Sequence, residues 1–145
     1  MLTQLIYVSK RSLNCTEKDI EQILVASQRN NHALDVTGVL LYSKDRFLQV
    51  LEGDFLTVKK LYDKIKKDPR HYEAFLIGLR PIEKREFPNW SMAGKTMNLQ
   101  GVEFKNYLSP EEETQFQKVL NAQSTDASQA SRLIQTFFMQ RDSVS

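Results

Sequence analysis

The stretch that decides the fold is VTGVLLYSKDRFLQVLE, residues 36–52. It contains two apolar runs, 36–42 and 47–52, separated by the polar residues 43–46. Runs of this length, rich in valine, leucine and aromatic residues and joined by a short polar connection, are typical of a β-hairpin. The sequence therefore predicts two adjacent antiparallel strands with a four-residue loop at 43–46.

Upstream of the hairpin, the sequence predicts a strand and a helix. QLIYVS at 4–9 carries apolar side chains at odd and even positions, as a strand inside a sheet does. Thr16 and Asp19 have the spacing of a capping box. Apolar positions then follow at helical spacing from Ile20 until Asn30-Asn31, which predicts an amphipathic helix.

Downstream of the hairpin, the pattern continues with a second helix and two more strands. Asp54 can cap a helix over 55–65, which ends before the proline at 69. Residues 74–80 are predicted to form a fourth strand, and 90–96 a fifth.

The order of these elements, β-α-β-β-α-β plus one strand, is that of the ferredoxin-like α+β fold. Right-handed crossovers place both helices on one sheet face and the first strand beside the third, which brings Tyr7 toward Gln49. The opposite face would stay bare and apolar unless the tail covers it. We expect two C-terminal helices, about 109–122 and 126–141, to do so, and divide the chain into a domain at 1–96 and a helical extension at 97–145.

Composition narrows the possible partners and location. The chain has 145 residues, 41% hydrophobic and 26% charged, which suffices for one core with an appendage. Twenty basic and eighteen acidic residues leave a net charge of +2, so charge gives no reason to expect binding to nucleic acid or a membrane. No signal-like segment or apolar stretch of roughly 20 residues is present, and we expect a cytoplasmic protein. Cys15, His32 and His71 do not have metal-ligand spacing, so no metal is assigned.

The common catalytic motifs GxGxxG, GxxxxGK[ST], HExxH and GxSxG are absent, so we do not expect an enzyme. An RNA-binding module of this fold would need a basic, aromatic third strand, which FLQVLEG at 47–53 is not. A small phosphatase of this fold would need a glycine-rich loop after the first strand, where the chain has SKRSLN at 9–14. A ferredoxin-like ligand- or protein-interaction module without photoactivity stays open as the alternative.

Several polar residues stand where a plain core would be apolar. Gln49 shares a strand face with apolar neighbours, so its amide needs buried partners, and Tyr7 faces it. Asn30-Asn31 can end a helix or present an amide to a heterocycle. The basic segment KIKKDPRH, 64–71, can balance a helix dipole or bind phosphate. Each has an ordinary structural explanation when taken alone.

Six segments together resemble the BLUF domains, the flavin-based blue-light sensors, across about residues 3–95. In order, they are LIYVS at 5–9, SQRNN at 27–31, TGVLLY at 37–42, FLQVLEG at 47–53, DPRHY at 68–72 and FPNWSM at 87–92. The resemblance implies a ferredoxin-like fold that holds FAD noncovalently between its two helices, with FMN or riboflavin as alternative flavins.

The resemblance also implies a role for individual residues. Tyr7 matches the family's essential tyrosine and Gln49 its switching glutamine. The other matched positions would line the flavin or relay the state of the glutamine. Those lining the flavin are Ile23, Asn30, Asn31, Lys64, Ile65, Arg70 and His71, and those relaying the state are Trp90 and Met92 on the last strand.

A signalling mechanism follows from the same resemblance. Light-driven electron and proton transfer from Tyr7 would leave the Gln49 amide rotated or tautomerised. A buried amide that changes partners costs roughly 1–3 kcal/mol, enough to bias a two-state element. The last strand would pass this change to the C-terminal helices. The expected output is a separate signalling protein or a change in a homo-oligomer.

Overall fold

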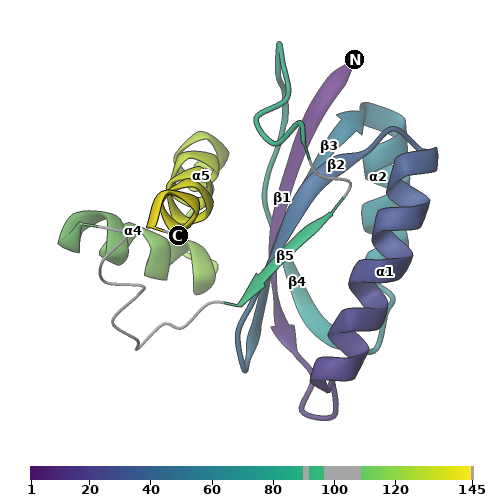
Figure 1. Cartoon of the computed structure of the whole chain (residues 1–145), viewed down its shortest axis with the longest axis horizontal. Helices are drawn as coiled ribbons and strands as arrows, with labels where there is room; N and C mark the ends of the chain where they lie inside the picture. The colour runs from purple at the N-terminus through teal and green to yellow at the C-terminus, as the bar shows by residue number, and fades with distance from the viewer. Residues whose placement is uncertain (90–91, 97–108, 145) are drawn as a thin grey trace.

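The computed structural model describes residues 1–89, 92–96 and 109–144. Within these ranges the chain forms a five-stranded sheet with helices on both sides (Figure 1). In chain order the elements are β1 (Leu2–Arg11), α1 (Glu17–Ala33), β2 (Thr37–Tyr42), β3 (Arg46–Asp54), α2 (Phe55–Ile65), β4 (His71–Pro81), β5 (Ala93–Thr96), α4 (Pro110–Leu120) and α5 (Ala127–Val144).

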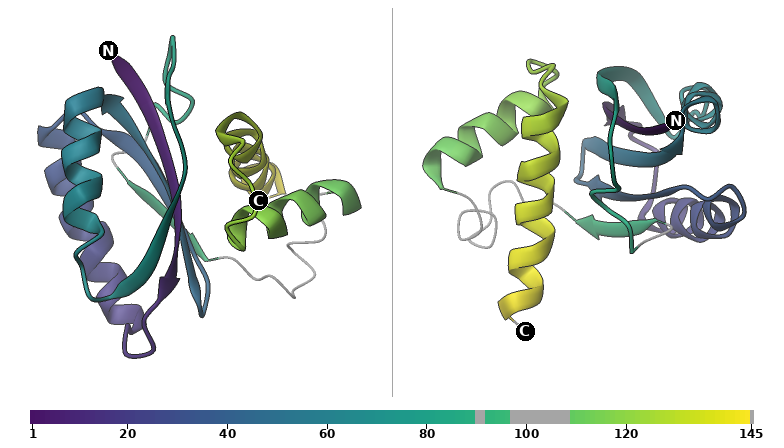
Figure 2. Two further views of the ribbon diagram at one scale, coloured as in Figure 1. Left: turned by 180° about the vertical axis from the view of Figure 1, so that it is seen from behind. Right: turned by 90° about the horizontal axis from the view of Figure 1, so that it is seen from above.

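The sheet has the strand order β4-β1-β3-β2-β5. The first four strands pair antiparallel, whereas β5 joins the edge parallel to β2. The predicted neighbourhood of the first and third strands is confirmed. Helices α1 and α2 lie on one face and α4 and α5 on the other, as both views in Figure 2 show. The expected ferredoxin-like α+β fold with a covered second face is therefore confirmed.

Alternation along the strands builds a separate core on each face of the sheet. On the face toward α1 and α2, Leu5, Tyr7, Leu40 and Leu51 pack with Ile20 and with residues from α2. On the other face, Ile6, Val8, Leu41, Leu48 and Val50 pack beneath α4 and α5, which contribute Phe116, Val119, Leu120, Ala130, Leu133 and Ile134. The tail helices therefore bury apolar sheet surface that would otherwise face water.

The helix starts follow the sequence signals, with one exception. Thr16 and Asp19 form both bonds of a capping box on α1. Asp54 occupies the N-cap position of α2, but its side chain makes no capping hydrogen bond there. Its carboxylate instead lies 3.0 Å from the amino group of Met1. Helix α1 continues through Asn30-Asn31 to Ala33, so the asparagines do not end it.

Several predicted boundaries differ from the structure, among them the first and fourth strands, which are longer than predicted at Leu2–Arg11 and His71–Pro81. Arg46 belongs to β3, where it pairs with Lys10, so the hairpin loop is shorter than predicted. The last strand is Ala93–Thr96, and Met92 precedes it in a bend. The two tail helices, expected at about 109–122 and 126–141, are Pro110–Leu120 and Ala127–Val144. Trp90 lies outside the described residues.

Some observations concern membranes and metals. None of the helices within the described ranges has the length and apolarity to cross a bilayer. Among the same residues, no three histidine, cysteine or acidic side chains are grouped so as to hold a metal ion. The thiol of Cys15 is buried in the core beneath α1 and α2.

Candidate functional site

A cavity of about 660 Å³ lies between the sheet and helices α1 and α2. Its floor comes from β1, β2 and β3, its sides from the two helices, and one end from the segment 67–71. The size is within the usual range for pockets that hold a small molecule or cofactor. The lining residues are Tyr7, Ile23, Ala26, Ser27, Asn30, Asn31, Leu40, Phe47, Gln49, Leu51, Leu61, Lys64, Ile65, Lys67, Asp68, Pro69, Arg70 and His71.

The structure brings the residues expected to line the cofactor to this one cavity. Tyr7, Ile23, Asn30, Asn31, Gln49, Lys64, Ile65, Arg70 and His71 all belong to the lining. Met92 is absent from the lining but contacts Gln49 from behind. The sequence pattern thus located these side chains around one space, while their contacts with a ligand stay a prediction.

Tyr7 and Gln49 form the polar centre of the floor. They are direct cross-strand partners on β1 and β3, so the sheet register itself sets them side by side. The Tyr7 hydroxyl donates to Gln49 Oε1 over 2.5 Å, and both side chains are buried. Burial raises the pKa of Tyr7 far above its usual value, so the phenol stays protonated and acts as a donor.

The other end of the Gln49 amide faces sulfur. Gln49 Nε2 donates to the Sδ atom of Met92 over 3.4 Å, a weak bond because thioether sulfur is a poor acceptor. The backbone carbonyl of Met92 accepts from Gln28 Nε2 on α1 over 3.0 Å. The bond at Nε2 is therefore the weaker of the two, and an exchange of the two amide ends would also break the strong bond from Tyr7 to Oε1, at a cost of roughly 1–3 kcal/mol.

His71 closes the cavity near Tyr7, with the two ring centroids 6.0 Å apart. Its Nε2 lies 2.6 Å from the carbonyl of Ile65, and its Nδ1 lies 2.8 Å from the hydroxyl of Ser9. Because a carbonyl only accepts, Nε2 is the donor to Ile65, and Nδ1 forms the second hydrogen bond of the ring with Ser9. His71 thereby ties the end of α2 to β1.

Positive charge gathers at one end of the cavity, at Lys64, Lys67 and Arg70. The Arg70 guanidinium is held by the Asp68 carboxylate, with Nη2 and Oδ2 2.5 Å apart, and it holds the pKa of Asp68 below its usual range. Arg70 is thus already partly neutralised, whereas neither Lys64 nor Lys67 forms an ion pair with another of the described residues. These lysines can meet an anion at the mouth.

The donor set fits a planar heterocycle with an anionic tail. Aliphatic side chains of Ile23, Ile65 and Leu40 offer flat apolar contacts, and Asn31 and Gln49 bring amides to the same cavity. A flavin has this combination of an apolar ring system, a polar edge and a phosphate chain.

Comparison with known proteins agrees with this fit. The family model "Sensors of blue-light using FAD" matches residues 2–93.

The chain belongs to the BLUF family.

Residues 2–93 are therefore a sensor module that detects blue light by means of a bound flavin. This membership argues against the alternative of an interaction module without photoactivity.

Similar proteins place this module in different contexts. Photoactivated adenylate cyclase subunit beta of Euglena longa is 35% identical over 96 residues, which cover 66% of this chain and 11% of that protein. The blue light- and temperature-regulated antirepressor BluF of Escherichia coli (strain K12) is 44% identical over 72 residues, 50% of this chain and 18% of that protein. The chain thus spans about a tenth to a fifth of the length of these curated relatives.

Among solved structures, the dark state of the BLUF protein BlrB is similar over nearly its whole length. The two share 32% identity with a TM-score of 0.73, and the match covers 92% of this chain and 95% of that chain. The match therefore extends beyond the first 93 residues into the C-terminal helices.

Sequence reasoning missed several residues of the site. Leu40 and Phe47 line the cavity from strands where the pattern indicated only core. Gln28 was not predicted, although it lies three residues before Asn31, about one helical turn, and therefore near the same face of α1. Lys67 and Asp68 lie within the basic segment 64–71, but their distance from the cavity depends on where α2 ends.

Proposed function

We propose that the cavity between α1, α2 and the sheet is the flavin site, and that Tyr7, Gln49 and Met92 are its light-driven switch. The observation that carries this proposal is the 2.5 Å hydrogen bond from Tyr7 to Gln49 on the cavity floor. It joins an oxidisable ring to an amide that has a weak second partner.

Each group of lining residues has a distinct task in this proposal. Ile23 and Ile65 flank the ring, and Asn30 and Asn31 serve its polar edge. Lys64 serves the ribose and phosphate end, with Arg70 and His71 beside it. FAD is the proposed occupant, and FMN or riboflavin would use the same inner part of the cavity.

The flavin supplies absorption of blue light and, once excited, an oxidant. Tyr7 would give up one electron to this oxidant, and its acidified hydroxyl proton would move along the hydrogen bond toward Gln49 Oε1. Return of the electron and proton restores the phenol with no net chemistry. The Gln49 amide ends with its donor and acceptor exchanged, which alters what Tyr7 and Met92 meet. The changed hydrogen bonding to the ring shifts absorption to the red.

The output belongs to the same proposal. A change at Met92 reaches β5 directly, because β5 begins at the next residue. We propose that residues 1–96 form the flavin domain and that the extension 97–145 passes the signal on, with Trp90 as a further relay residue in the sequence before β5. The receiver is a separate signalling protein or a second copy of this chain, and the chain has no catalysis of its own. The expected cytoplasmic location is tested by cell fractionation.

Light-minus-dark absorption spectra of the purified, FAD-loaded chain test the switch. The wild type should be yellow and show a reversible red shift under blue light. Gln49→Leu should keep the flavin and lose the shift, because leucine has no donor to exchange. Gln22→Leu, the same substitution at an exposed position of α1, should leave the shift intact. A colourless wild type that cannot be reconstituted with FAD, or a normal shift in Gln49→Leu, would refute the proposal.

A further inference from the structure

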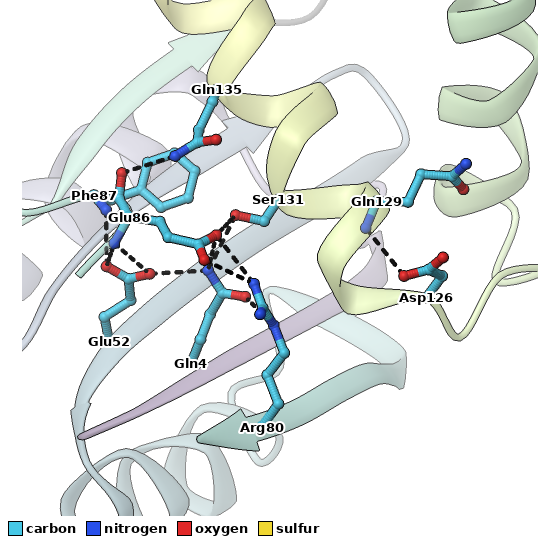
Figure 3. A network of polar contacts seen from close by, with 9 residues as sticks. All are labelled: Gln4, Glu52, Arg80, Glu86, Phe87, Asp126, Gln129, Ser131 and Gln135. Carbon is cyan, nitrogen blue, oxygen red and sulfur yellow. Dashed lines mark hydrogen bonds and ion pairs between the residues drawn. The ribbon is translucent and has the colours of Figure 1, made fainter. Parts of the chain in front are cut away.

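A buried polar network lies on the sheet face opposite the flavin cavity, where an apolar core would be expected. Its members come from β1, β3, β4, the segment after β4, and α5 (Figure 3). We call it the Glu52 network, and it consists of Gln4, Glu52, Arg80, Glu86 and Ser131. Gln4, Glu52 and Ser131 are fully buried, so their partners are fixed rather than shared with water.

Glu52 anchors the segment that follows β4. Its carboxylate accepts the backbone N–H groups of Glu86 and Phe87 over 2.9 and 2.8 Å. Removing this carboxylate would leave two backbone donors without their acceptor, and one of them, on Phe87, is buried. A single side chain of β3 therefore sets the path of the chain toward β5.

Gln4 links this carboxylate to α5. Its Nε2 donates to Glu52 Oε2 over 2.9 Å and lies 3.1 Å from the Ser131 hydroxyl of α5. Its Oε1 accepts from Arg80 over 3.0 Å, which fixes the orientation of the amide. The Ser131 hydroxyl and the Glu86 carboxylate are also hydrogen-bonded. Helix α5 thus meets β1 and the post-β4 segment through polar contacts at Ser131, and Gln135 adds a hydrogen bond from its Nε2 to the Glu86 carbonyl over 3.1 Å.

The network shares a ladder with the proposed switch. Tyr7 pairs with Gln49, and Gln4 pairs with Glu52, in the same antiparallel register of β1 and β3. The first pair faces the cavity and the second faces α5. Because the two pairs lie on one ladder only three residues apart, a shift of β3 against β1 at Gln49 can be transmitted to Glu52.

We infer that the Glu52 network is a second signalling route from the switch. By this route, the structural change at the Gln49 amide is transmitted to α5 through β3 rather than through β5. The inference rests on the proposed function. In the dark the network holds α5 and the post-β4 segment in place. Light strains the Gln4–Glu52 pair and loosens the attachment of α5 at Ser131.

Hydrogen–deuterium exchange of α5 in the FAD-loaded full chain, in the dark and under blue light, tests this route. Exchange in wild-type α5 should rise in the light. Glu52→Gln places an amide donor against the donor of Gln4 and should raise dark exchange in α5 about tenfold or more. It should also remove most of the light-minus-dark difference, yet keep the red shift, because the cavity floor is untouched.

The reciprocal exchange supplies a rescue. In Gln4→Glu/Glu52→Gln, the carboxylate at 4 can accept from Arg80 and from the amide at 52, whose oxygen still faces the two backbone donors. It also meets the Glu86 carboxylate, to which Gln4 Nε2 donates over 3.2 Å in the wild type, so the rescue is partial. The double variant should recover part of the slow dark exchange and part of the light response that Glu52→Gln loses.

A milder variant guards against misfolding. Ser131→Ala deletes only the hydroxyl on α5 and should raise dark exchange about tenfold. Thr136→Ala, whose hydroxyl bonds within α5 to Arg132, is the matched control and should not. A wild-type light-minus-dark difference in both Glu52→Gln and Ser131→Ala, with the red shift present, overturns the route alone. Absence of the red shift in the wild type overturns the proposed function itself.

Discussion

At the scale of single residues, strand alternation explains which parts of the site the sequence can reveal. Gln49 stands out because its two neighbours on the same face, Phe47 and Leu51, are apolar. Glu52 gives the same signal on the other face, beside Leu48 and Val50, and a stricter reading of alternation would have found it. Its partner Ser131 could not be found in this way, because that contact depends on how α5 packs.

The substitution Tyr7→Phe removes only the hydroxyl of Tyr7 and keeps its ring. We expect this variant to keep the flavin and lose the red shift, with a stability loss of about 1–3 kcal/mol from the unpaired Gln49 oxygen. Absorption spectra and denaturant unfolding measure the two effects. Tyr62→Phe is the matched control, since this ring lies 5.2 Å from that of Tyr7 and the donor to Gln49 is retained. Equal loss of the shift in both variants would contradict the assignment to Tyr7.

Burial of Tyr7 also predicts a dependence of stability on alkaline pH. Because its pKa in the fold is raised above the unfolded value of about 10, stability is fully present below that pH and falls as pH rises above it. After a rapid jump to high pH, a phenol in contact with solvent ionises at once. Tyr7 should ionise only at the rate of unfolding, measured by tyrosinate absorbance against circular dichroism. If the fast phase of the tyrosinate absorbance were smaller in Tyr7→Phe than in the wild type, Tyr7 would belong to the rapidly ionising rings and the prediction would be wrong.

At the scale of elements, local sequence signals predicted where helices begin, but they missed the strand boundaries that depend on tertiary contacts. Each of the capping boxes at Thr16 and Ser109 is encoded by only four consecutive residues, and both form in the structure. The strand position of Arg46 depends instead on pairing with Lys10, far away in the chain. The short β5 likewise depends on a parallel neighbour that local periodicity does not encode.

The close seat of α5 on β4 gives a prediction about Gly78. A Cβ atom there would lie 2.4 Å from the Cβ of Ala127, which has no rotamer with which to yield. We expect Gly78→Ala to destabilise the protein by about 1–3 kcal/mol and to raise amide exchange in α5. Gly94→Ala should cost less, since there the nearest atoms are the flexible end of Leu24. Thermal unfolding of the two variants compares them, and an equal or reversed order would be against this account.

At the scale of the whole molecule, the two cores explain why the chain works as one unit. Sequence reasoning predicted an uncovered apolar face and a tail able to cover it, because both follow from the pattern of apolar residues. It could not show that polar residues are set into the same contact, as Gln4 and Ser131 are. The proposed boundary near residue 96 therefore divides the chain by function, into flavin binding and signal output. It does not divide it into two units that fold independently.

Phe116 tests this view. It is fully buried in α4 and packs in the core shared with β1, β2 and β3. Phe116→Ala should cost about 3–5 kcal/mol and lower the temperature of flavin release together with that of helix melting. Flavin fluorescence and circular dichroism follow the two events. Phe55→Ala, at a position 41% exposed, should change both far less. Flavin release at the wild-type temperature in Phe116→Ala would mean that the two parts unfold separately.

The burial of Cys15 makes the molecule convenient for spectroscopy. Its thiol is the chain's single native one, it is shielded by α1 and α2, and burial raises its pKa, so little thiolate is available at neutral pH. A cysteine introduced at an exposed site such as Arg132 on α5 would react first with a maleimide dye or spin label. The wild-type background can then report distances between α5 and the chromophore before and after illumination.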